Sequence, residues 1–417
     1  MNRPKQVVIL CGGLGTRLLP YTKHLPKPMI SCNSQPFLLY LLNQMSDQGL
    51  RKFVLPTGYL GESIKNYFGD GSEWGWSIQY SYGPIDWDTG KRIWETRSKL
   101  DDCFMLLYSD NFAQFPLEKV FALHKKNQTA LTFMASPKYP GNVALSELGV
   151  VEKYNNSRSE TSLNLVEIGY MIIEKNRVLD FYQHSECSFS SILKRMVESN
   201  EVSAWVQNDN YHSISDPKRW RDTEEYLANK KIILIDRDGV INKKSKQGEY
   251  ISNWNQFEWV SDTVEAMQNL AKKGFKFIVI TNQAGIARNM LKSEELEKIH
   301  TNMKKILFGK GVEIIDIYFC PHHWEDKCYC RKPNPGMFHR ASNDWKLRLD
   351  KTLFIGDDYR DCQASYNAGC KSVLIGDINQ SEKLLAYEQP IYKNTRLTEC
   401  MPTIIKFFNS DNKDDNN

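Results

Sequence analysis

The stretch Lys230–Asn242, "KKIILIDRDGVIN", decides the fold of the second half of the chain. Four aliphatic residues run without interruption into Asp236, a pattern typical of a buried parallel strand whose carboxyl end holds a site. The segment "QVVILCGG" at residues 6–13 has the same form and ends in glycines instead of aspartates. We therefore expect two domains, each beginning with such a strand.

Helix-like and strand-like patterns alternate after both stretches. Such alternation predicts an α/β fold, with two Rossmann-like domains built on mainly parallel sheets. The clearest helix pattern is 261–274, for which Ser261 or Asp262 is the expected cap and Gly274 the expected stop. The other expected elements are helices at 36–50 and 293–311, and strands at 52–59, 103–110, 275–283, 314–320 and 351–358.

The domain boundary is expected in the charged helical stretch 221–231. We predict a first domain at 1–226, a second at 227–406 and a disordered polar tail at 407–417.

Composition indicates an ordinary globular protein of 417 residues, with 41% hydrophobic and 25% charged residues and a net charge of +4. This balance gives no reason to expect a nucleic-acid or membrane partner, and a homo-oligomer is left open. The apolar run Val7–Cys11 is too short for a signal peptide, so a cytoplasmic location is expected.

Glycines in "LCGGLGTRLLPYTKHLPKPM", residues 10–29, indicate a phosphate-binding loop. Without a Cβ, a glycine lets backbone N–H groups approach an anion closely. Arg17 and Lys27 add cations suited to phosphate oxygens.

The whole string resembles the G-G-x-G-T-R-L and P-K-P signature of sugar-1-phosphate nucleotidyltransferases, over about residues 5–226. This resemblance implies transfer of a nucleotidyl group from an NTP to a sugar 1-phosphate, with release of pyrophosphate. It implies that Arg17 and Lys27 contact the reacting phosphates and that Asp110 binds Mg²⁺. The implied substrate-binding residues are Gly12, Gly13, Gly15 and Thr16 for the triphosphate, and Lys153, Glu167 and Gly169, with Glu152 as a further candidate, for the sugar.

Two departures from the family pattern bear on this activity. Ser213 stands where many relatives have a second metal-binding aspartate, and Asp209 or Asp216 are the candidate replacements. The loop "PIDWDTGKRI", residues 84–93, resembles glucose-1-phosphate cytidylyltransferases and leaves the base open.

In the second domain, Asp236 and Asp238 are two residues apart at a strand end, so both carboxylates can face one side. Such a pair can supply a nucleophile and a general acid–base for phosphoryl transfer. Later strand ends carry Thr281 and Asn282, then Asp357, while "CRKP" places Lys332 as a phosphate-neutralising cation.

Together these motifs resemble the haloacid-dehalogenase-like phosphatases, over about residues 230–406. The resemblance implies an aspartyl-phosphate on Asp236, with Asp238 as acid and then base. It implies Mg²⁺ held by Asp236, the Asp238 carbonyl and Asp357. The implied substrate-binding residues are Thr281, Asn282, Gln283 and Arg331, with Lys332 as the catalytic cation.

"CPHHWEDKCYC", residues 320–330, crowds thiols and imidazoles into one loop. In a reducing compartment such a cluster indicates a metal site rather than disulfides. We predict a structural Zn²⁺ held by Cys320, His322, Cys328 and Cys330, with His323 as the less favoured imidazole. The ion would fix the loop that carries Arg331 and Lys332.

Within these families the chain resembles D-glycero-D-manno-heptose 1-phosphate guanylyltransferases and D-glycero-D-manno-heptose 1,7-bisphosphate 7-phosphatases. The resemblance implies a bifunctional enzyme of nucleotide-heptose synthesis, with GTP as first choice and CTP as second. Alternatives are a histidinol-phosphate or other sugar-phosphate phosphatase, a hexose 1-phosphate as the acceptor, or one domain that only binds.

Overall fold

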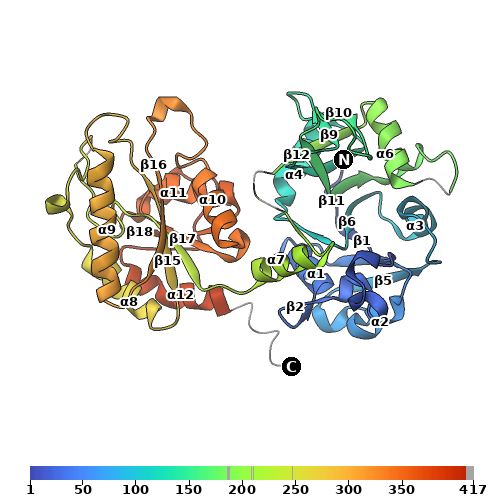
Figure 1. The fold of residues 1–417 in the computed structure, drawn as a ribbon, viewed down its shortest axis with the longest axis horizontal. Coiled ribbons are helices and arrows are strands. Elements are labelled where there is room, and N and C mark those ends of the chain that lie inside the picture. Colours follow the sequence, from blue (N-terminus) through green and yellow to red (C-terminus); the bar gives the residue numbers. More distant parts are fainter. Residues whose placement is uncertain (186–187, 208, 210, 247, 410–417) are drawn as a thin grey trace. The chain divides into compact units, whose positions relative to one another are not determined.

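The computed structural model describes residues 1–185, 188–207, 209, 211–246 and 248–409. The chain forms two compact units, Met1–Ala228 and Asn229–Asn417 (Figure 1). Within the described ranges, no helix combines the length and apolar character needed to cross a membrane.

The first unit is built on a mixed sheet with the order β10-β9-β11-β6-β1-β4-β5, extended by β8 on β11 and β12 on β8. Strands β1, β4, β5 and β6 are parallel, whereas β11 is antiparallel to β6 and β8. The strands are β1 Gln6–Leu10, β4 Lys52–Thr57, β5 Ser77–Tyr82, β6 Cys103–Tyr108, β8 Leu131–Pro137, β9 Val143–Leu145, β10 Val151–Tyr154, β11 Leu165–Glu174 and β12 Val202–Val206. Two small pairs join β2 Ser31–Cys32 to β3 Gln35–Pro36, and β7 Asn111–Phe112 to β13 His212–Ser213.

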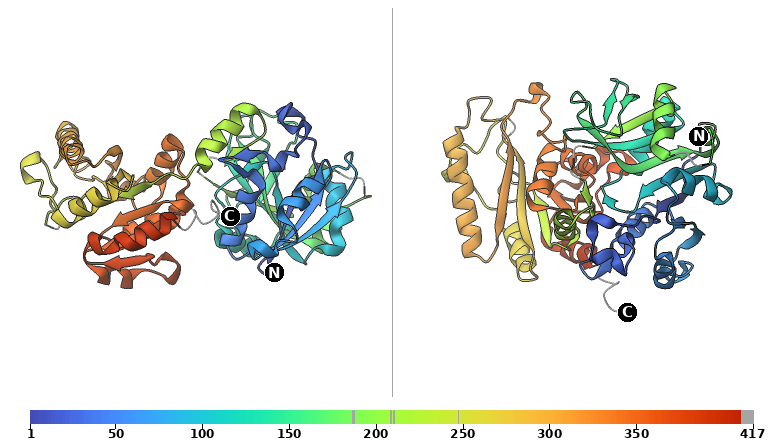
Figure 2. Two further views of the ribbon diagram at one scale, coloured as in Figure 1. Left: turned by 90° about the horizontal axis from the view of Figure 1, so that it is seen from below. Right: turned by 45° about the vertical axis from the view of Figure 1, so that its right-hand side comes forward.

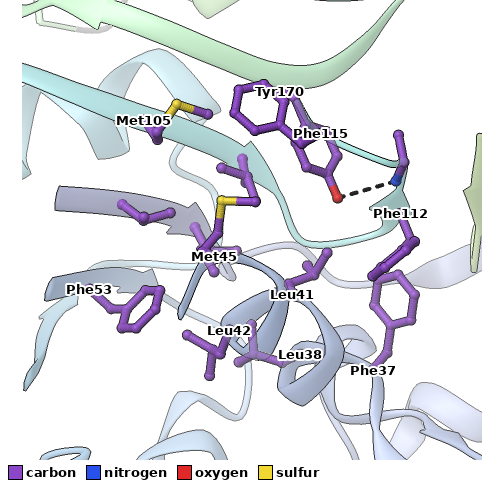
Figure 3. Close-up of a cluster of buried hydrophobic side chains, with 14 of the residues drawn as sticks. Phe37, Leu38, Leu41, Leu42, Met45, Phe53, Met105, Phe112, Phe115 and Tyr170 are labelled. Atoms are coloured by element: carbon purple, nitrogen blue, oxygen red, sulfur yellow. Dashed lines mark hydrogen bonds between the residues drawn. The ribbon is translucent and has the colours of Figure 1, made fainter. Parts of the chain in front are cut away.

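Helices cover both faces of this sheet. One core contains residues of α1 Phe37–Asp47, α2 Gly61–Phe68, α4 Leu117–Asn127 and α7 Pro217–Leu227. The other contains residues of α3 Thr89–Thr96, α5 Lys175–Leu179 and α6 Phe189–Glu198. In the first core, Leu41 and Met45 of α1 pack near Tyr170, whose hydroxyl accepts a hydrogen bond from the Ala113 N–H (Figure 3).

The second unit has a fully parallel sheet with the order β16-β15-β14-β17-β18-β19. Its strands are β14 Ile232–Ile235, β15 Lys276–Asn282, β16 Ile314–Cys320, β17 Leu353–Gly356, β18 Lys371–Ile375 and β19 Tyr392–Asn394. Helices α8 Ser261–Ala271, α9 Ser293–Gly309 and α12 Leu397–Asn409 share one core, and α10 Gly336–Trp345 and α11 Tyr359–Ala368 share another. The right view of Figure 2 shows α9 and the α10–α11 pair on opposite sides of the strands.

Two sequence-based expectations are wrong in detail. Asp262 does not cap its own helix α8, because its carboxylate accepts hydrogen bonds from the Leu397 and Thr398 N–H groups at the start of α12. The polar tail does not begin at 407, because Phe408 is buried and α12 runs to Asn409. The rest of the expected tail, 410–417, lies outside the described residues.

Candidate functional sites

A cavity of about 420 Å³ opens in the first unit at the carboxyl ends of β1 and β6. The glycine loop follows β1, and Asp110 follows β6, so the parallel pairing of these strands brings them together. The cavity contains six of the predicted residues, Gly12, Gly13, Gly15, Thr16, Arg17 and Lys27, together with Asp110. It is also lined by Trp87, Asp88, Thr89 and Arg92 from the loop and helix after β5, and by Ser215.

Lys27 and Asp110 form an ion pair across this cavity, with 2.5 Å between Nζ and Oδ2. Lys27 begins the short helix Lys27–Met29, which Pro26 precedes and which contains Pro28. Both side chains are largely shielded from solvent, which strengthens their attraction. A phosphate group entering the cavity would meet a fixed ammonium and a carboxylate able to hold a metal ion.

Arg92 is a site residue whose role the sequence did not reveal. It is 4% exposed, and its guanidinium donates to the carbonyls of Gly12, Thr57 and Pro84. A Cβ on Gly12 would lie 2.2 Å from this guanidinium, so a larger residue there would displace the Arg92 side chain. Arg92 therefore ties the glycine loop to two neighbouring segments. The sequence signal that could have identified it is the position of Arg92 within the stretch 84–93, which resembles a family motif.

The expected sugar-binding residues fall into two groups. Lys153 is 63% exposed in side chain, pairs with Glu160 and does not line the cavity, and Glu152 beside it is exposed. Glu167 and Gly169 adjoin the cavity through Tyr108, since a Cβ on Gly169 would lie 2.5 Å from that ring. Burial raises the pKa of Glu167 to about 7, although a hydrogen bond from the Gly169 N–H acts to lower it.

Ser213 lies beside the proposed metal ligand of the first unit, because β13 pairs with β7 and the Ile214 N–H donates to the Asp110 carbonyl. Neither candidate replacement lines the cavity. Asp216 caps α7 through hydrogen bonds from Lys218 and Arg219, and Asp209 is buried elsewhere. The carboxylate that the family resemblance led us to expect at this position is a hydroxyl here.

In the second unit, Asp236 lies at the end of β14 beside Lys332. The Lys332 Nζ is 3.0 Å from Oδ2 of Asp236 and 2.8 Å from Oδ1 of Asp361, and it donates to the Ile280 carbonyl. Burial raises the pKa of Asp236 to about 7, although the Lys332 ammonium opposes the shift. The arrangement is a buried carboxylate held next to a cation.

Three carboxylates of this site can hold a divalent cation. One oxygen each of Asp236, Asp357 and Asp361 lies within 4.8 Å of the others. The Oδ1 atom of Asp357 is buried without a hydrogen-bond partner, which is the setting expected of a cation ligand. Gly239 has a φ of 96°, and a Cβ there would lie 2.2 Å from Asp357. Sequence reasoning missed Asp361, although the spacing in "GDDYRD" places it one helical turn after Asp357.

The carboxylate of Asp238 is not one of these three. Arg237, which is fully buried, contacts both of its oxygens, and the side-chain amides of Asn242 and Gln283 also donate to it. Burial acts to raise the pKa of Asp238, but Arg237 and the two amides outweigh this and hold the pKa below its usual value. An acid role for Asp238 therefore requires its release from Arg237.

The remaining predicted contacts surround Lys332. The Asn282 side chain accepts a hydrogen bond from the Lys332 N–H and donates one to the Lys332 carbonyl, so it holds the segment that carries the Lys332 ammonium. The Thr281 hydroxyl accepts from Gln283, which orients Asp238. The Nη1 atom of Arg331 is buried without a partner.

The four expected zinc ligands converge. The Sγ atoms of Cys320, Cys328 and Cys330 lie 3.4–3.6 Å apart, and the His322 Nδ1 is 3.1 Å from the Cys330 Sγ. Tetrahedral Zn–S bonds of about 2.3 Å place sulfur atoms roughly 3.8 Å apart, so the group has the size of a zinc site. The His323 Nδ1 instead accepts from the Glu325 N–H.

Fold and sites define two enzymes of phosphorus-ester chemistry on one chain. Residues 6–225, more than half of the chain, match the family model of the nucleotidyl transferases, and residues 231–391 match that of the polynucleotide kinase 3 phosphatases. The chain belongs to the nucleotidyl transferase family and, over its second half, to the haloacid-dehalogenase-like phosphatases. It is thus a nucleotidyltransferase joined to a phosphomonoesterase.

The second half is similar to two curated phosphatases. It is 34% identical over 145 residues to D-glycero-beta-D-manno-heptose-1,7-bisphosphate 7-phosphatase of Pseudomonas putida, covering 35% of this chain and 82% of that protein. It is also 34% identical over 146 residues to D-glycero-alpha-D-manno-heptose-1,7-bisphosphate 7-phosphatase of Photorhabdus laumondii, covering 33% of this chain and 78% of that protein. The first half is similar to the crystal structure of HddC from Yersinia pseudotuberculosis, with 20% identity, a TM-score of 0.45, and coverage of 54% of this chain and 99% of that one.

Proposed function

We propose that the second unit removes the 7-phosphate of D-glycero-D-manno-heptose 1,7-bisphosphate. The first unit then joins the heptose 1-phosphate to a nucleotide, with GTP as first choice and CTP as second. The single observation that carries this is the pairing of a nucleotide-type cavity with a phosphatase site whose sequence is 34% identical to heptose bisphosphatases. One reaction makes the sugar 1-phosphate that the other consumes.

In the phosphatase step, a carboxylate oxygen of Asp236 attacks phosphorus and the bond to the sugar oxygen breaks. Asp238, turned from Arg237, gives that oxygen its proton. Water then attacks the aspartyl-phosphate as Asp238 takes a proton back, and inorganic phosphate leaves. Lys332 holds the nucleophile and offsets charge on the phosphoryl oxygens.

Both sites can hold Mg²⁺, but the second unit offers three carboxylates for it and the first unit only Asp110 among the proposed ligands. In the second unit Asp236, Asp357 and Asp361 would hold it, and it would supply charge neutralisation at the phosphoryl group. In the first unit Asp110 would hold it, with the substrate phosphates as further ligands. Zn²⁺ fits the Cys320, His322, Cys328 and Cys330 group as a structural ion, since four protein ligands leave no open position.

In the nucleotidyl transfer step, the sugar phosphate oxygen attacks the α-phosphorus and pyrophosphate leaves. The backbone of Gly12, Gly13 and Gly15 would cradle the triphosphate, and Arg17 would offset charge on the leaving pyrophosphate. Lys27 would contact the reacting phosphates, because it lies beside Asp110, the residue that would hold their metal ion.

A second candidate is that the first unit binds nucleotide without turnover. Ser213 in place of a metal-binding carboxylate favours it. Mass spectrometry of the products formed from heptose 1,7-bisphosphate with all four NTPs decides between the two. The expected products are inorganic phosphate, pyrophosphate and one nucleotide-heptose. Phosphate with no nucleotide-sugar from any NTP supports the binding module, and no phosphate release contradicts the heptose assignment.

A further inference from the structure

The side chains of the consecutive residues Lys243 and Lys244 have different partners, one at the surface and one in the phosphatase site. The Lys244 Nζ lies 2.6 Å from Oδ2 of Asp357, and its side chain is 49% exposed. The Lys243 Nζ lies 2.9 Å from Glu258 at the surface, and its side chain is 66% exposed. Hydrogen bonding between the Lys243 N–H and the Glu258 carbonyl fixes the chain at this point. One ammonium therefore reaches the carboxylate cluster while its neighbour faces solvent.

The charges of the phosphatase site indicate that Lys244 helps to neutralise it. Asp236, Asp357 and Asp361 carry three negative charges when ionised, and Lys332 contacts only the first and third. A phosphate ester adds two further negative charges. A divalent cation with Lys332 alone leaves the assembly net negative, so a second ammonium at Asp357 reduces the repulsion that a phosphate dianion meets.

Lys244 and a metal ion use the same carboxylate. The Asp357 Oδ2 is held by Lys244, and its Oδ1 is buried without a partner. An ammonium on a flexible four-carbon stem can move by several ångströms, and the half-exposed side chain of Lys244 has room to do so. Once a divalent cation binds Asp357, the ammonium becomes available to a phosphoryl oxygen.

We propose that Lys244 is a phosphate-binding residue of the phosphatase site, which gives up Asp357 for the substrate's phosphate group when the metal binds. The inference rests on the proposed role of Asp357 as a metal ligand, and it holds for any phosphomonoester. A plain surface ion pair, such as Lys243 with Glu258, contributes little and has no such effect.

The test uses the full chain with Lys244→Met and, as matched control, Lys243→Met. Calorimetry first measures Mg²⁺ binding without substrate, then inorganic phosphate binding at saturating Mg²⁺. Lys244→Met removes a competitor for Asp357, so Mg²⁺ is expected to bind about three- to fivefold more tightly. It also removes a charged hydrogen bond to phosphate, so inorganic phosphate is expected to bind about tenfold more weakly. Lys243→Met is expected to change neither affinity.

The opposite signs of the two changes distinguish this role from others. Unchanged affinities in Lys244→Met reduce Lys244 to a surface ion pair, and a weakening of both assigns it a structural role; either result overturns the proposal. If wild-type protein binds Mg²⁺ while Asp357→Asn binds it equally well, the metal assignment itself fails. That failure is visible without any lysine variant.

Discussion

The Nζ atom of Lys332 lies 3.0 Å from Oδ2 of Asp236, and the lysine side chain is 3% exposed. Such burial makes the pair interdependent, since removing one partner leaves an uncompensated charge. We expect Asp236→Asn to lower phosphate release by about 10⁴-fold or more, because the amide is no nucleophile. Pyrophosphate release from an NTP and a sugar 1-phosphate is expected to stay at the wild-type rate. Loss of both activities in this variant would contradict two independent sites.

The Lys27–Asp110 ion pair makes the corresponding prediction for the first unit. Lys27→Met is expected to lower nucleotidyl transfer by about 10²–10³-fold, as does the loss of one charge-stabilising donor in other enzymes. Phosphate release should be unaffected. The exposed residue Lys23, at the end of the helix Tyr21–Lys23 and outside the cavity, provides the control, and Lys23→Met is expected to retain activity. An equal loss in both variants would show that general positive charge matters, not this contact.

The loop at residues 320–330, which we propose holds zinc, should be needed for the phosphatase activity alone. His322→Ala is expected to lower bound zinc from one equivalent and to reduce phosphate release, because the loop that carries Lys332 loses a ligand. His323→Ala, which removes the neighbouring imidazole, is expected to keep both. Metal analysis by mass spectrometry and the phosphatase assay check the pair. Full zinc content in His322→Ala with loss in His323→Ala would reverse the ligand assignment.

Ser213 allows the first-unit metal site to be rebuilt. Ser213→Asp places a second carboxylate in β13, next to the strand that follows Asp110. Extra ligand charge tightens divalent-cation sites, so the Mg²⁺ concentration for half-maximal nucleotidyl transfer is expected to fall by about tenfold. The variant should unfold more easily in EDTA, because Ser213 is buried and a buried carboxylate needs a partner. An unchanged Mg²⁺ requirement would mean that this position does not face the metal.

Parallel strand order explains how much of the site could be predicted from the sequence. Asp236 and Asp357 end the adjacent strands β14 and β17, so any fold with this pairing brings them together. Lys332 comes from a loop, but "CRKP" and the cysteines beside it marked the loop. The glycine loop and Asp110 follow the same rule through β1 and β6.

The partners of individual side chains could not be predicted in this way. Arg92 reaches carbonyls at Gly12 and Thr57, and nothing local in its helix indicates that it is buried. The contact of Asp238 with Arg237 depends on the side-chain conformation of a fully buried arginine. Likewise Asp262 does cap a helix, as its residue type suggested. The helix that it caps is α12, which packs against α8, and not its own helix α8.

Asp262 therefore links the pH dependence of stability to the contact between α8 and α12. Burial acts to raise the pKa of Asp262, but hydrogen bonds from Thr398 and the Arg396 guanidinium outweigh it and lower the pKa. Folding thus favours the carboxylate anion. The stabilisation is fully present above the unfolded-state pKa of about 3.9 and is lost as the pH falls through the lower folded-state pKa.

Asp262→Asn should expose this dependence. At neutral pH the variant is expected to lower the free energy of unfolding by about 1 kcal/mol, because the amide keeps an acceptor oxygen but loses the charge that strengthens the hydrogen bonds from Thr398 and Arg396. The difference from wild type should shrink as the pH falls below about 4, because the wild-type carboxylate then becomes neutral too. Urea unfolding of both proteins across this range measures it. A difference that stays constant with pH would mean that Asp262 contributes through shape and hydrogen bonding alone, without its charge.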